Sequence, residues 1–132
     1  MPGRPQRLDS ENSSAMKKAL RLAAVAEAAT GLALLIAPSL VGWSLLGEEL
    51  TGIAIAVGRV TGIALIGLAV ACWPGPPWAG MLVYTVGVAA YLAYLGIAAR
   101  LIGTFLWPAV VAHTILAALL IHASTKGRKT KP

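Results

Sequence analysis

Three ionisable side chains, Glu27, Arg59 and His113, lie inside three different long apolar segments. A charged side chain at the centre of a bilayer costs about 2.5–3.5 kcal/mol on insertion scales, so such residues usually face protein and have a partner. Two chemistries suit this trio. Glu27 either forms an ion pair with Arg59 that joins two helices, or it stays unpaired and takes up and releases a proton. We therefore expect an intramembrane polar cluster of Glu27, Arg59 and His113.

Arg59 has a second option. A helical side chain leans toward the N-terminus of its own helix, so the long Arg59 stem can carry its guanidinium to the membrane surface. Gly58 and Gly62 flank Arg59 at a four-residue spacing that allows another helix to approach closely. The sequence leaves both arrangements open, the pair with Glu27 and the surface position.

The three tyrosines, Tyr84, Tyr91 and Tyr94, fall along one stripe of a single apolar segment. They either pack in the core or line a polar pocket. His113 is isolated, because His122 lies nine residues further on, which is about 13 Å along a helix. We therefore expect a structural, hydrogen-bonded histidine. No zinc-protease, phosphate-loop or nucleophile-elbow motif occurs, so the sequence predicts no metal site, no cofactor and no catalytic residue.

The elements that would position these residues are four apolar spans. Charged residues make up 12% of the 132 residues, about half the share usual in soluble domains. Each span is close to the roughly 20 residues that cross a bilayer as a helix. The predicted spans are 19–37, 52–73, 78–99 and 104–123. We expect an all-α integral membrane four-helix bundle over 19–123, with a disordered basic tail at 1–18 and a basic tail at 124–132.

The distribution of charge predicts the orientation. Nine of the 11 Lys and Arg residues lie near the two ends of the chain, whereas the loop 38–51 carries Glu48 and Glu49 and no basic residue. The positive-inside rule then places both termini in the cytoplasm, with Arg100 as the exception. Tryptophans at the predicted boundaries agree with this topology, because indole rings favour the headgroup level. They are Trp43, Trp73, Trp78 and Trp107.

The apolar loop 38–51 is expected to form a short helix in the membrane surface, with a lid over the bundle as the alternative. The single cysteine, Cys72, excludes an internal disulfide. Because the basic residues flank apolar spans, they indicate topology and not nucleic-acid binding. We expect a multi-pass protein of the bacterial inner (plasma) membrane, whose partners are the lipid bilayer, a small apolar ligand, and a second copy or a larger membrane complex.

The four-span plan, with Gly58-Arg59-Val60-Thr61-Gly62 opening the second span, resembles the DoxX-like group of small bacterial membrane proteins. This resemblance implies a link to quinone-coupled redox complexes. The stretch Leu22-Ala23-Ala24-Val25-Ala26-Glu27 is similar to the first span of small multidrug-resistance transporters, in which a lone glutamate couples proton movement to transport. The rest of the chain departs from that family, and Arg59 would repel a cationic substrate.

Three functions remain as hypotheses. The first is an accessory or structural membrane protein that binds a small apolar ligand, a quinone or a lipid, within the bundle. The second is a proton-coupled transporter of small molecules that uses Glu27. The third is a membrane-embedded enzyme in which Glu27, His113 and a tyrosine act as acid and base.

Overall fold

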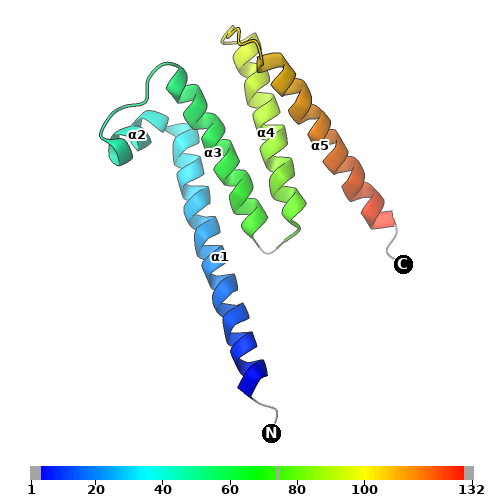
Figure 1. Ribbon diagram of the computed structural model, residues 1–132. Helices are drawn as coiled ribbons and strands as arrows, with labels where there is room; N and C mark the ends of the chain where they lie inside the picture. The colour runs from blue at the N-terminus through cyan, green and yellow to red at the C-terminus, as the bar shows by residue number, and fades with distance from the viewer. Residues whose placement is uncertain (1–3, 74, 130–132) are drawn as a thin grey trace.

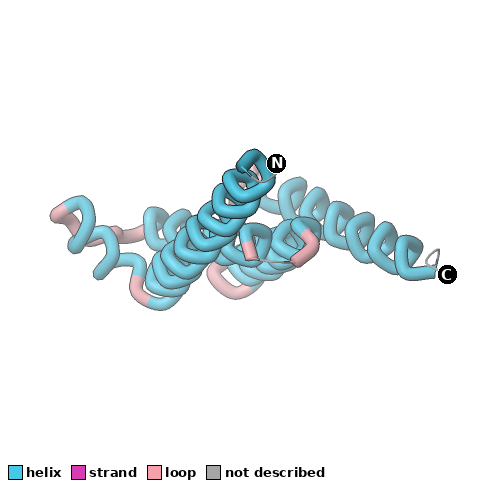
Figure 2. Tube along the Cα trace, turned by 90° about the horizontal axis from the view of Figure 1, so that it is seen from below, coloured by secondary structure: helices cyan, strands magenta, loops and turns pink. Residues whose placement is uncertain are grey.

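The structure is a computed structural model that describes residues 4–73 and 75–129. These residues fold into five helices and no strand (Figures 1 and 2). The helices are α1 (Arg4–Ile36), α2 (Pro38–Leu46), α3 (Ile53–Cys72), α4 (Pro77–Ile97) and α5 (Leu106–Lys129). The all-α class is confirmed. The start of α1 and the end of α5 both lie at the end of the molecule opposite α2, which we call the terminal end (Figure 1).

Four of the helices are long and apolar enough to cross a membrane, as the sequence predicts. Their apolar parts agree with the predicted spans to within a few residues, except that the first begins at Ser13. These parts are Ser13–Ile36, Ile53–Cys72, Pro77–Ile97 and Leu106–Thr125. Proline sets two of the boundaries, because Pro38 and Pro77 each occupy the first turn of a helix, where the missing N–H costs nothing.

The long helices form an open row (Figure 1), and in the described part of the chain each contacts only the long helices next to it in sequence. Within the described residues, α3 packs between α1 and α4, and α4 packs between α3 and α5. Among the residues that the structure describes, α1 contacts neither α4 nor α5. The closed four-helix bundle that we expected is therefore not confirmed within one chain, and α1 and α5 are left as two free edges.

Glycines allow the helices of the row to approach backbone to backbone. A Cβ on Gly62 would lie 2.6 Å from the carbonyl oxygen of Gly31, and one on Gly31 would lie 2.7 Å from that of Gly62. Gly67 and Gly80 make the corresponding contact between α3 and α4. The close approach expected at Gly62 is confirmed, and van der Waals packing over small residues is the attraction that remains between helices in lipid.

The first helix is longer than the sequence predicts. α1 starts at Arg4 and runs without a break through most of the segment 1–18, which we expected to be a disordered tail. No proline or glycine lies between Pro5 and Gly31, and Lys, Arg, Gln and Glu are good helix formers, so nothing local ends the helix. α5 continues to Lys129, and residues 1–3 and 130–132 lie outside the described part.

The loop after α1 contains the expected short helix. Its last residue is followed by Gly47, whose positive φ of 79° lets its N–H bond to the carbonyl oxygen of Trp43. The Ser39 hydroxyl donates a 2.7 Å hydrogen bond to the carbonyl oxygen of Leu50. This bond joins the part of the loop that leads into α3 to the start of α2. It therefore fixes the position of the residues just before Leu50.

Candidate functional site

Glu27 lies on the α1 side of the α1–α3 contact and is half-buried. The Gly31–Gly62 contact sets the register of the two antiparallel helices, so a residue on α1 lies level with the α3 residue for which the two numbers add to 93. Glu27 is thus level with Ile66. Within the part of the chain that the structure describes, its carboxylate forms no ion pair.

Arg59 lies elsewhere, in a groove between the end of α1, α2 and the start of α3. It is half-buried, and the groove that it lines has a volume of about 420 Å³. We call this the Arg59 groove. Its lining residues are Ile36, Ala37, Pro38, Ser39, Leu40, Trp43, Glu49, Ile55 and Arg59.

The register explains why Glu27 and Arg59 do not pair. Glu27 is four residues before Gly31, toward the terminal end, and Arg59 is three residues before Gly62, toward α2. Seven residues at about 1.5 Å each separate the two levels by about 10 Å. Because α1 and α3 are antiparallel and side chains lean toward their own N-termini, the two side chains also diverge. Of the two arrangements that the sequence left open for Arg59, the geometry favours the surface position.

His113 is half-buried between α5 and α4. Its Nδ1 lies 2.8 Å from the carbonyl oxygen of Ala109, one turn earlier in the same helix. Its ring meets Tyr84 edge to face, with 5.6 Å between ring centroids and an interplanar angle of 67°. An aromatic contact of this geometry is worth about 0.5–1.5 kcal/mol beyond the area that it buries. This environment agrees with the expected structural histidine.

The structure does not join the three ionisable candidates, Glu27, Arg59 and His113, into one cluster. Tyr84 contacts Gly67 of α3, so His113, Tyr84 and Glu27 lie at similar heights along the row. α3 and α4 nevertheless stand between α1 and α5, which have no contact in the described residues. An acid–base set of Glu27 with His113 is therefore not assembled within one copy of the row.

The tyrosine stripe is divided between two environments. Tyr84 packs between α3 and α5, whereas Tyr91 stacks on Tyr94, with ring centroids 6.3 Å apart and planes 22° from parallel. Tyr94 is 57% exposed. None of the three tyrosines lines any of the four grooves described between or beside the helices. Core packing, one of the two readings of the stripe, fits Tyr84 best.

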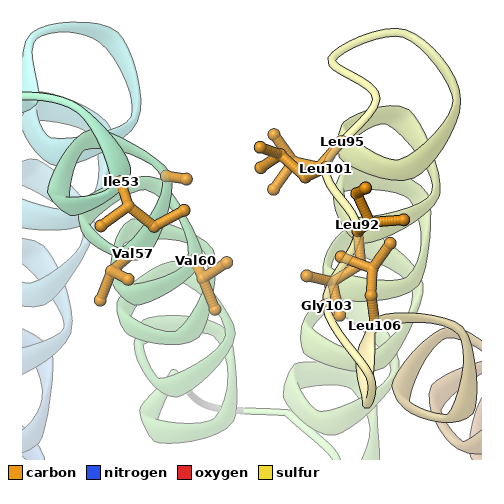
Figure 3. A pocket seen from close by; sticks show the side chains of 10 residues that line it. Ile53, Val57, Val60, Leu92, Leu95, Leu101, Gly103 and Leu106 are labelled. Carbon is orange, nitrogen blue, oxygen red and sulfur yellow. The ribbon is translucent and has the colours of Figure 1, made fainter.

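Two further grooves have apolar linings. The α3–α4 groove, of about 420 Å³, lies at the α2 end between α3, α4 and the loop after α4 (Figure 3). Its lining residues are Ile53, Ala56, Val57, Val60, Leu92, Leu95, Leu101, Ile102, Gly103 and Leu106. The α1–α3 groove, of about 430 Å³, lies near the terminal end. Its lining residues are Ala24, Val25, Ala28, Ile66, Ala69, Val70, Trp73, Gly75, Pro76 and Ala79.

The sequence did not single out the residues of these apolar grooves. Figure 3 shows Ile53, Val57 and Val60 of α3 across an open space from Leu92 and Leu95 of α4. Such residues are ordinary in a membrane span, so their type carries no signal. The one available signal was the apolar pair Leu101-Ile102 in a short loop, where Leu101 closes the groove and Ile102 is almost fully exposed.

Metal chemistry finds no support in the geometry. No group of three or more His, Cys, Asp or Glu side chains comes together among the residues with a described position. Cys72 is a free thiol near the end of α3 and is half-buried.

No family model, no curated protein and no solved structure matches the chain. The resemblance to the DoxX-like group therefore stays a prediction from the residues of the spans.

Proposed function

We propose that this chain is a small accessory protein of the plasma membrane, which holds the hydrocarbon part of a lipid or of a quinone in the α3–α4 groove. Four helices that are long and apolar enough to span a bilayer support the membrane location. In this proposal both termini are cytoplasmic, and α2 and the α3–α4 groove lie on the outer side. The free edges at α1 and α5 are covered by lipid or by other membrane subunits.

The observation that carries the proposal is the lining of the α3–α4 groove. All ten residues that line it have apolar side chains or none, and they come from three separate stretches of chain. Buried apolar surface favours a ligand by about 25 cal/mol per Å². A lining without hydrogen-bonding side chains suits an acyl or isoprenoid chain, because a polar head placed there would lose its hydrogen bonds to water.

Mass spectrometry of lipophilic material that co-purifies with the protein tests this function. We expect a defined lipid or quinone at near-stoichiometric amounts in the wild type. Val60→Phe places a larger side chain in the α3–α4 groove and should displace that compound. Val111→Phe is the matched control, because Val111 is 55% exposed on α5 and lies outside the groove. Equal amounts of the compound in both variants would contradict the proposal.

Proton-coupled transport is the second candidate, and one observation favours it. Glu27 is a half-buried carboxyl group within the apolar part of α1, Ser13–Ile36, without an ion-pair partner among the described residues. A carboxyl group without a fixed partner can exchange its proton for a substrate cation. Reconstituted protein should then release protons when substrate is added, and Glu27→Gln should abolish the release without loss of stability.

A further inference from the structure

The Arg59 groove differs from the two apolar grooves in carrying opposite charges on its walls. Arg59 of α3 and Glu49 of the loop before α3 both line it, together with the Ser39 side chain. Its remaining wall is apolar and contains Trp43 of α2. One groove thus offers a cation, an anion and a hydrocarbon surface within about 420 Å³.

Arg59 and Glu49 do not neutralise each other directly. No ion pair joins them in the part of the chain with described side chains, although both line the same groove. A half-buried guanidinium gains from an anionic partner, and phosphate suits it well because two N–H groups can bond two oxygens at once. A carboxylate such as Glu49 in turn accepts hydrogen bonds from a primary ammonium group. The complementary ligand carries a phosphate and an ammonium group a short distance apart.

The walls of the groove are held in place before any ligand arrives. The Ser39–Leu50 hydrogen bond of 2.7 Å fixes the residue next to Glu49. On the α3 side of the groove, Gly58 packs closely against Pro38 and Leu50. A Cβ on Gly58 would lie 3.3 Å from a side-chain carbon of each. Arg59 follows Gly58 directly in α3. A preformed site reduces the cost of ordering that binding would otherwise carry.

The height of the groove matches that of a lipid headgroup. Arg59 is six residues from Ile53, the first residue of α3, or about 9 Å along the helix. Its side chain leans from there toward α2. α2 itself exposes Trp43 at 60%, Leu45 at 72% and Leu46 at 77%. An apolar helix of this kind with an exposed indole belongs in the interfacial layer of a membrane.

We propose that the Arg59 groove binds the headgroup of a phospholipid that carries a phosphate and a primary ammonium group, with the phosphate on Arg59 and the ammonium on Glu49. The apolar wall takes the start of an acyl chain. This inference rests on the membrane insertion in the proposed function, but not on the ligand of the α3–α4 groove, which involves other residues of α3.

Native mass spectrometry of the full chain in detergent, with dioleoyl lipids added one at a time, tests the site. Wild type should retain phosphatidylethanolamine about tenfold better than phosphatidylglycerol, which lacks the ammonium group, since one charge-assisted hydrogen bond accounts for about that factor. Glu49→Gln should remove this preference and leave binding of phosphatidylglycerol unchanged. Glu48→Gln is the matched control, because Glu48 lies outside the lining of the groove.

Arg59→Gln should weaken retention of both lipids about tenfold, and Arg59→Lys, which keeps the charge and is less disruptive to folding, should weaken both by less. Circular dichroism checks that each variant is helical. Equal retention of the two lipids by wild type, or equal effects of Glu48→Gln and Glu49→Gln, would overturn the inference.

Soluble glycerophosphoethanolamine should compete poorly with the lipid for the groove. Competition at concentrations equal to that of the lipid would show that a free phosphate ester, and not a membrane lipid, is the ligand. Val60→Phe should leave this binding intact, so the two proposals can fail separately.

Discussion

The Gly31–Gly62 contact between α1 and α3 offers the sharpest test of the fold. Gly62→Val places a Cβ 2.6 Å from the carbonyl oxygen of Gly31 and 3.1 Å from the backbone nitrogen of Leu35. Ordinary contacts begin at 3.4 Å. The helices must therefore separate locally by 3.4 − 2.6 = 0.8 Å. Neither atom belongs to a flexible side chain, so the strain cannot be relieved by a change of rotamer.

Overpacking of this kind costs about 1–3 kcal/mol. Valine recovers about 0.3 kcal/mol through its better helix propensity than glycine. We therefore expect a net destabilisation of about 0.7–2.7 kcal/mol, which changes the unfolding equilibrium by a factor of about 3 to 85, since about 1.4 kcal/mol corresponds to tenfold. Titration with sodium dodecyl sulfate from mild detergent micelles, followed by tryptophan fluorescence and circular dichroism, measures this shift.

Gly103→Val is the matched control, because the atom nearest to a Cβ at this position is the Cβ of Leu106, at 3.8 Å. It should change stability by less than about 0.5 kcal/mol, as surface substitutions usually do. Gly31→Val should resemble Gly62→Val, and the double variant should cost less than the sum, because both substitutions separate the same two backbones. A Gly62→Val variant as stable as Gly103→Val would refute the α1–α3 register, and with it the separation of Glu27 from Arg59.

Three other predictions concern the separation of Glu27 from Arg59, the contact of Tyr84 with His113, and the membrane topology. Glu27→Gln and Arg59→Gln should have additive effects on stability in detergent, within about 0.5 kcal/mol, because the two residues lie at levels about 10 Å apart. Substantial recovery of stability in the double variant would instead be evidence for an ion pair between them. Tyr84→Leu and His113→Leu should be coupled by about 0.5–1.5 kcal/mol in a double-mutant cycle through their edge-to-face contact, whereas additive effects would argue against that contact. In the proposed topology, with both termini in the cytoplasm, Thr104→Cys in a cysteine-free background should react with a membrane-impermeant maleimide on intact cells; protection from the reagent would contradict that topology.

The sequence predicts the helices well because their causes are local. Uninterrupted apolar stretches set the four long helices. Pro38 and Pro77 set the starts of α2 and α4. The prediction from sequence was less accurate at the N-terminus, where α1 begins at Arg4. A polar composition suggested a tail there. The segment also contains good helix formers, Arg, Gln, Glu and Lys, and no proline or glycine after Pro5, so the helix can propagate back from the apolar span.

The candidate site was only partly predictable. The sequence identified Glu27, Arg59 and His113 because ionisable residues are rare in apolar spans. It could not give their partners. His113 meets Tyr84, and Arg59 shares a groove with Glu49, a loop residue that the sequence used only as a topology marker.

Hydropathy and helix formation act over a few turns of one segment, so the four apolar helices, the breaks between them and the rare charges within them follow from the sequence. The open row of helices, the different levels of Glu27 and Arg59, and the three grooves between helices depend on how the helices pack. Packing depends in turn on register. Backbone contacts at Gly31 with Gly62 and at Gly67 with Gly80 set how far each helix slides along its neighbour, and in a chain with 14 glycines no local pattern shows which of them will meet.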